Sequence, residues 1–177
     1  GEVIDIGGDY LDAPGYDFLG LIVGSEGQFG VVTEATVRIL KAPEGARPML
    51  LGFDSSESAG ACVAGIIAAG IVPVAIEFMD KPAIEVCENF AGAGYPLDVE
   101  VLLIVEVEGS RDEIDALLHT IAEIAERYRP RVVRVSKSAE ESAAIWKGRK
   151  AAFGAIGQIS DYYCMDGVIP LSKLSEA

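Results

Sequence analysis

The stretch Val99-Glu100-Val101-Leu102-Leu103-Ile104-Val105-Glu106-Val107 decides which fold is expected for most of this chain. Its side chains alternate with a period of two, the repeat of a β-strand. One face is wholly apolar, and the other carries glutamates at the strand ends, so we expect one core face and one partly wet face. Strands of parallel sheets are usually apolar on both faces, so the alternation favours an antiparallel sheet.

Strands and helices alternate on both sides of this stretch. Capping boxes of the Ser-x-x-Glu type begin at Ser110 and Ser138, and Asp80 is placed as an N-cap, so each predicts a helix start. Strands are expected at 49–53, 72–78, 99–107, 131–136 and 161–170, and helices at 57–69, 80–90, from 110 to before 130, and at 138–156. The fold class is therefore α+β, a ferredoxin-like antiparallel sheet with helices on one face.

A different pattern precedes residue 42. Glycines recur at Gly24, Gly27 and Gly30, after the apolar run 18–23, which we interpret as a strand, and before a β-branched stretch at 31–39, which also predicts a strand. Glycine permits close backbone approach, so the loop fits either a tight turn or a concavity of N–H groups around a polar ligand. The spacing is not the Gly-x-Gly-x-x-Gly dinucleotide fingerprint.

Composition limits the class of partner. The chain has 177 residues and a formal net charge of −14, which argues against nucleic acid and anionic membranes but not against a small anionic ligand. No apolar run reaches the ~20 residues of a transmembrane helix, and no signal peptide is recognisable. The 3 cysteines lack zinc-site spacing, which favours reduced thiols and a cytoplasmic location. His119 is the sole histidine and is interpreted as a non-functional helical residue.

Two segments in the same order resemble one family. Gly24-Ser25-Glu26-Gly27-Gln28-Phe29-Gly30-Val31-Val32-Thr33 is similar to the flavin-contacting loop of FAD-linked 2-hydroxyacid oxidases and dehydrogenases, usually Gly-Ser-Glu-Gly-Thr-Leu-Gly-Ile-Val-Thr. Ile145-Trp146-Lys147-Gly148-Arg149-Lys150-Ala151-Ala152-Phe153, with Tyr162-Tyr163-Cys164-Met165-Asp166-Gly167-Val168-Ile169-Pro170, resembles the branch that contains the flavin subunit of glycolate oxidase.

The resemblance implies a fragment of a longer flavoprotein with FAD as cofactor. Residues 1–42 would end the FAD-binding domain, and residues 43–177 would be most of the oxidase C-terminal, substrate-capping domain. The family pattern places Arg149 on the substrate carboxylate, where a planar guanidinium can pair with both oxygens. It implies no catalytic residue and no metal ligand within this fragment. The residues that it places near the flavin are Gly24, Ser25, Gly27, Gly30 and Val32.

The expected reaction is oxidation of a short 2-hydroxy acid, glycolate or D-lactate, to the 2-oxo acid. Some relatives carry a hydroxyl residue at Phe153 and a lysine at Cys164, so the pocket here is expected to be smaller and less cationic. An electron-accepting subunit or carrier is the implied partner, and an oligomer is possible. The alternative is a non-catalytic ferredoxin-like module that binds a small molecule or mediates assembly, since such folds host many functions.

Overall fold

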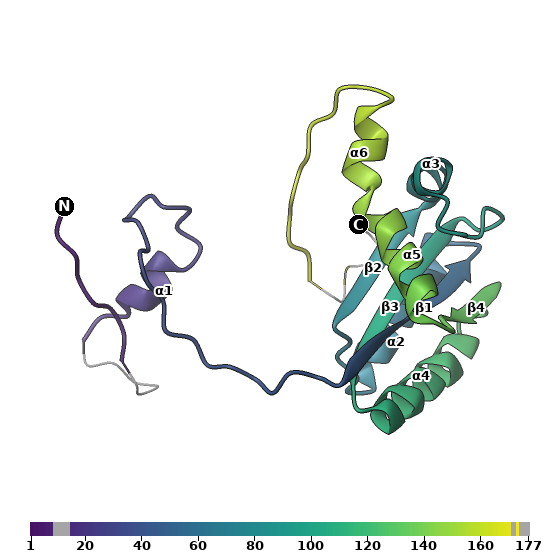
Figure 1. Ribbon diagram of the computed structural model, residues 1–177, viewed down its shortest axis with the longest axis horizontal. Coiled ribbons are helices and arrows are strands. Elements are labelled where there is room, and N and C mark those ends of the chain that lie inside the picture. The colour runs from purple at the N-terminus through teal and green to yellow at the C-terminus, as the bar shows by residue number, and fades with distance from the viewer. Residues whose placement is uncertain (9–14, 171–172, 174–177) are drawn as a thin grey trace. The chain divides into compact units, whose positions relative to one another are not determined.

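A computed structural model (Figure 1) describes residues 1–8, 15–170 and 173. The chain divides into two compact units, Gly1–Lys41 and Ala42–Ala177, which are described separately. Among the described residues, no helix is long and apolar enough to cross a membrane.

In its described residues the first unit has one short helix, α1 (Phe18–Ile22). The Asp17 side chain caps it by accepting a hydrogen bond from the Gly20 N–H at 2.8 Å. The apolar run 18–23 was predicted as a strand, so that prediction is wrong. The strand predicted at residues 31–39 is also not formed within the described part of this unit. A β-branched run makes a strand only where a neighbouring strand satisfies its backbone groups.

The second unit is built on four antiparallel strands in the order β2-β3-β1-β4. They are β1 (Gly45–Phe53), β2 (Ala75–Asp80), β3 (Val101–Gly109) and β4 (Val132–Val135). This order is that of a ferredoxin-like sheet, with a helix in place of the usual β2–β3 hairpin. The predicted α+β class and the antiparallel sheet are confirmed. The extended segment 161–170 forms no strand.

Helices connect the strands and continue after the last one. They are α2 (Ser56–Ala68), α3 (Lys81–Ala91), α4 (Arg111–Glu126), α5 (Ala139–Lys150) and α6 (Ala152–Gly157). The N-caps Asp80, Ser110 and Ser138 lie where the sequence predicted them. Ser110 and Glu113 form the reciprocal capping box, whereas Glu141 accepts from the Lys137 N–H at 2.8 Å instead of returning to Ser138. The single helix predicted over 138–156 is two helices that meet at Ala151.

Helices cover both faces of the sheet (Figure 1). The expectation that helices cover only one face is therefore wrong. On the first face Leu103 and its alternate neighbours pack against α2 and α4 in one core cluster. On the second face Leu102 and Ile104 pack against α3 and α5, through residues such as Ile84 and Ile145. The glutamates at the ends of the β3 stretch suggested a wet face, but its central residues are fully buried.

Candidate functional site

The last turn of α5 holds the predicted substrate residue, Arg149. Ile145 and Gly148 are buried and fix this helix against the sheet. A Cβ on Gly148 would lie 2.6 Å from both Ala93 Cβ and the Tyr95 hydroxyl, so only glycine permits this close approach. The Tyr95 hydroxyl in turn donates a hydrogen bond to the Ile145 carbonyl, and burial raises the pKa of Tyr95. These contacts fix the position of α5 against the second face of the sheet.

Arg149 forms an ion pair with β2. Its Nε donates a hydrogen bond to Glu77 Oε2 at 3.0 Å, and the two side chains are 31% and 32% exposed. Arg149 is therefore half-buried on the α3/α5 side of the sheet and is not a freely solvated surface arginine. Glu77 was not among the predicted site residues; the available signal was a carboxylate near the end of the apolar segment 72–78.

A second contact joins α5 to β3. The indole Nε1 of Trp146 donates to Glu106 Oε1 at 2.6 Å, and Trp146 packs against the core cluster of the second face. Trp146 is thus a half-buried anchor with a satisfied polar edge, which is a common role for tryptophan. Sequence reasoning also missed the role of Glu106. Its position among the glutamates at the ends of the β3 stretch was the signal.

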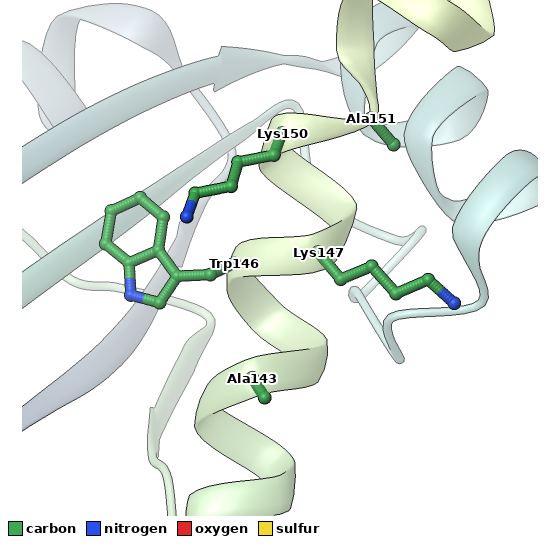
Figure 2. Close-up of a pocket in the computed structure, with 5 residues that line it drawn as sticks. All are labelled: Ala143, Trp146, Lys147, Lys150 and Ala151. Carbon is green, nitrogen blue, oxygen red and sulfur yellow. The ribbon is translucent and has the colours of Figure 1, made fainter.

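The outer face of α5 carries a shallow, open depression (Figure 2). Trp146 and Lys150 extend to the same side of the helix, and Lys147 extends to the other. Arg149 does not line this depression, whose residues are Ala143, Trp146, Lys147, Lys150 and Ala151. Three cations, Lys147, Arg149 and Lys150, lie in the last helical turn, where the helix dipole also favours positive charge. They form a locally cationic site in a chain whose net charge is −14.

Two aromatic side chains from the segment after α5 contact each other. Phe153 on α6 lies against Tyr162, with ring centroids 6.1 Å apart. Cys164 and Tyr163 are exposed. The side chain at position 153 is therefore an apolar ring packed against another aromatic ring.

The glycine loop belongs to the first unit. Gly24 and Gly27 both have φ of 79°, and Glu26 has φ of 50°, so the loop uses left-handed backbone at three positions. The N–H groups of Ser25 and Gln28 close turns onto Ile22 and Ser25. Within the described part of the chain, the N–H groups of Gly27 and Gly30 have no hydrogen-bond partner.

These features fit a polar cofactor edge. A Cβ at Gly24 or Gly30 would meet nothing within 4 Å, so the backbone is open to close approach. Unpaired N–H groups in such turns can hold the carbonyl or phosphate oxygens of a flavin nucleotide. Ser25 is half-buried, and Val32 is 64% exposed in a segment without regular structure. The assignment of these residues to FAD stays a prediction.

His119 lies on the exposed side of α4. Its Nε2 is 3.5 Å from Glu123 Oε1, and its side chain is 76% exposed, as expected for a helical surface residue. Among the described residues, no group of three or more His, Cys, Asp or Glu side chains could hold a metal ion.

Comparison with known proteins identifies the family. Residues 42–177 match the family described as FAD linked oxidases, C-terminal domain. The chain belongs to this family, so the resemblance predicted from its two motifs is confirmed, and FAD is the cofactor of the class.

Several proteins of named activity are similar to nearly the whole chain. It is 45% identical over 175 residues to glycolate oxidase subunit GlcD of Escherichia coli K12, covering 98% of this chain and 35% of that protein. GlcD of Bacillus subtilis is 31% identical over 177 residues, with 99% and 38% covered. D-lactate dehydrogenase of Anaerostipes hadrus is 26% identical over 187 residues, with 99% and 39% covered. The chain therefore spans little more than a third of the length of these relatives.

A solved structure supports the fold alone. Alkyldihydroxyacetonephosphate synthase aligns with a TM-score of 0.58 at 17% identity, covering 82% of this chain and 30% of that one.

Proposed function

We propose that this chain supplies the substrate-capping part of an FAD-dependent oxidoreductase that converts a short 2-hydroxy acid, glycolate or D-lactate, to its 2-oxo acid. Residues 1–42 would end the FAD-binding domain, and residues 43–177 would be the capping domain. The names of the relatives support this reaction class, since they are glycolate oxidase subunits and a D-lactate dehydrogenase. Bound FAD supplies the electron acceptor for the oxidation, which no amino-acid side chain can provide.

The observation that carries the proposal is the half-buried Arg149 on α5. A guanidinium binds a carboxylate through two parallel N–H···O bonds, and Arg149 uses only its Nε in the contact with Glu77. The remaining donors would bind the substrate carboxylate and fix which carbon faces the flavin. Gly24, Ser25, Gly27, Gly30 and Val32 would hold the flavin edge, largely through backbone N–H groups and the Ser25 hydroxyl.

The family resemblance favours a short substrate. It implies a smaller and less cationic pocket at Phe153, whose apolar ring lies against Tyr162, and at Cys164, which is exposed. We further propose a cytoplasmic location, which the free thiols of Cys62, Cys87 and Cys164 support. Electrons would leave to another subunit or a carrier, and the enzyme would act within an oligomer.

Substitution of Arg149 tests the proposal in the holoenzyme that contains this chain. The wild-type protein should show flavin absorbance that bleaches on addition of glycolate or D-lactate without oxygen. Arg149→Lys keeps the charge but loses the bidentate geometry, so KM should rise about 10- to 100-fold. Arg131→Lys is the matched control, because Arg131 also pairs with a carboxylate, Asp54, at 3.4 Å but lies outside the proposed site.

The non-catalytic alternative predicts a different result. A binding module would carry no flavin, and the 177-residue chain alone would bind a small effector. Absence of flavin absorbance from the purified full-length protein that contains this chain would refute the oxidoreductase proposal.

A further inference from the structure

Glu77 and Arg149 form the ion pair that joins β2 to α5. We propose that Glu77 is a positioning and specificity-determining residue for a monocarboxylic 2-hydroxy acid. It holds Arg149 through Nε and leaves the terminal amino groups of the guanidinium for the substrate carboxylate. This inference rests on the proposed function above, in which Arg149 binds that carboxylate.

The geometry of the pair separates the two ends of the guanidinium. Arginine presents five N–H donors in a rigid plane, one on Nε and four on the terminal nitrogens. Glu77 Oε2 accepts from Nε at 3.0 Å. In the described part of the chain, the terminal nitrogens of Arg149 have no protein partner. A carboxylate can therefore bind them while Glu77 stays in place.

Glu77 is held on a rigid element. It pairs in register with Ile104 of β3, and its neighbour on the same face, Met79, is buried. The backbone of Glu77 is thus fixed by the sheet, whereas Arg149 has a long side chain with several free torsions. The strand carboxylate orients the arginine, because a group on a regular element gives the more precise placement.

The strand carboxylates near Arg149 disfavour a second substrate carboxylate on the sheet side of the guanidinium, while Lys147 and Lys150 lie in the same turn of α5. Glu106 pairs with Ala75 of β2, and Glu77 pairs with Ile104, so Glu77 and Glu106 are diagonal neighbours on one face. Diagonal side chains on adjacent strands lie about 7–8 Å apart. One carboxylate of the substrate would be neutralised by Arg149, but another would meet these two glutamates.

An ion pair that serves only stability would behave differently. Exposed pairs contribute little to folding and nothing to catalysis. Lys81 and Glu100 provide such a pair, with Nζ and Oε1 2.8 Å apart and side chains 38% and 56% exposed. Its loss should leave substrate affinity unchanged, so Glu100→Ala is the matched control.

The experiment compares Glu77→Ala, Glu77→Gln and Glu100→Ala in the FAD-loaded holoenzyme. Glu77→Ala should raise KM for glycolate at least ~10-fold and keep kcat within about twofold, since it frees Arg149 to move without touching the reacting carbon. Glu77→Gln should raise KM less, because its amide oxygen still accepts from Nε. Glu100→Ala should match the wild type.

Substrate selectivity gives a second readout that a structural role would not move. Glu77→Gln removes one negative charge, so the ratio of kcat/KM for malate, a dicarboxylate, to that for glycolate should rise about 10-fold. An unchanged ratio together with a wild-type KM would overturn the inference. If Glu77→Ala does not fold, Glu77→Gln decides the matter by the same two readouts.

Arg149→Lys separates the two proposals. If this variant keeps the wild-type KM, Arg149 does not bind the substrate and the proposed function of the residue fails. If it raises KM while neither Glu77 variant changes KM or selectivity, only the role of Glu77 is refuted.

Discussion

At the scale of single residues, the partners of the candidate site come from distant parts of the chain. The family resemblance predicts Arg149, but its partner Glu77 depends on how β2 registers with β3. Likewise, Trp146 anchors α5 to the sheet, and its partner Glu106 was not predicted from the sequence. No local pattern encodes such pairings, because strand register is set by the whole sheet.

Burial of the Cys62 thiol predicts that the stability of the fold depends on pH. Burial raises the pKa of Cys62 from 9.0 to about 11. The folded chain therefore holds the thiol proton more tightly than the unfolded chain does. This contribution to stability is complete below about pH 9 and is lost as pH rises toward about 11. The free energy of unfolding, measured in urea over this range, should fall with rising pH.

Cys62→Ala provides the control for this dependence. The buried Tyr95 hydroxyl and the Lys81 ammonium also have raised pKa values, so some decline with the same sign should remain in the variant. The slope between about pH 9 and 11 should nevertheless be smaller than in the wild type. Identical slopes would contradict the assignment to Cys62.

At the scale of elements, helix starts were predictable and strands without partners were not. The caps Asp80, Ser110 and Ser138 are local signals, since each bonds to a backbone N–H three residues on. The segment 31–39 has strong β-propensity but no neighbouring strand, and the expected strand is not formed. Nor did the periodicity of 138–156 reveal the junction of α5 and α6 at Ala151.

The packing of α5 predicts opposite effects for two glycines. Gly148→Ala would place a methyl group 2.6 Å from Ala93 Cβ and from the Tyr95 hydroxyl, so it should lower the free energy of unfolding by about 1–3 kcal/mol. Gly154→Ala is the control, since its Cβ would approach only Phe90 Cζ at 3.9 Å. That variant should be neutral or up to about 1 kcal/mol more stable, because alanine is the better helix former. Urea denaturation of both variants measures the difference, and equal effects would contradict the packing of α5.

At the scale of the whole molecule, the sheet of the second unit separates two hydrophobic cores, one on each of its faces. The antiparallel class followed from the alternation of the β3 stretch, but that alternation also suggested one wet face. The structure buries Leu102 and Ile104 beneath α3 and α5 instead. Glutamates at a strand end report only on that end, while the middle of the strand is covered by helices that are distant in sequence.

Two core substitutions test this two-sided burial. Leu103 and Ile104 are both fully buried but face opposite cores. Leu103→Ala and Ile104→Ala should each lower the free energy of unfolding by about 2–5 kcal/mol. Val133→Ala, on the edge strand at a side chain 43% exposed, should cost about 1 kcal/mol or less. The free energies are measured by denaturant unfolding. A loss of stability in Ile104→Ala as small as in Val133→Ala would contradict burial of the second face.

The strand order has a consequence for how the chain matures during its synthesis. β1 lies between β3 and β4, and its first residue, Gly45, pairs with Gly109. Of the consecutive strands in this sheet, only β2 and β3 are neighbours, and α3 lies between them in the chain, so no tight hairpin forms early as a template. Long-range pairing of this kind slows folding. As the chain leaves the ribosome, the apolar faces of β1 and α2 must wait unpaired until β3 has emerged. We expect this interval to be when the nascent chain most needs a chaperone.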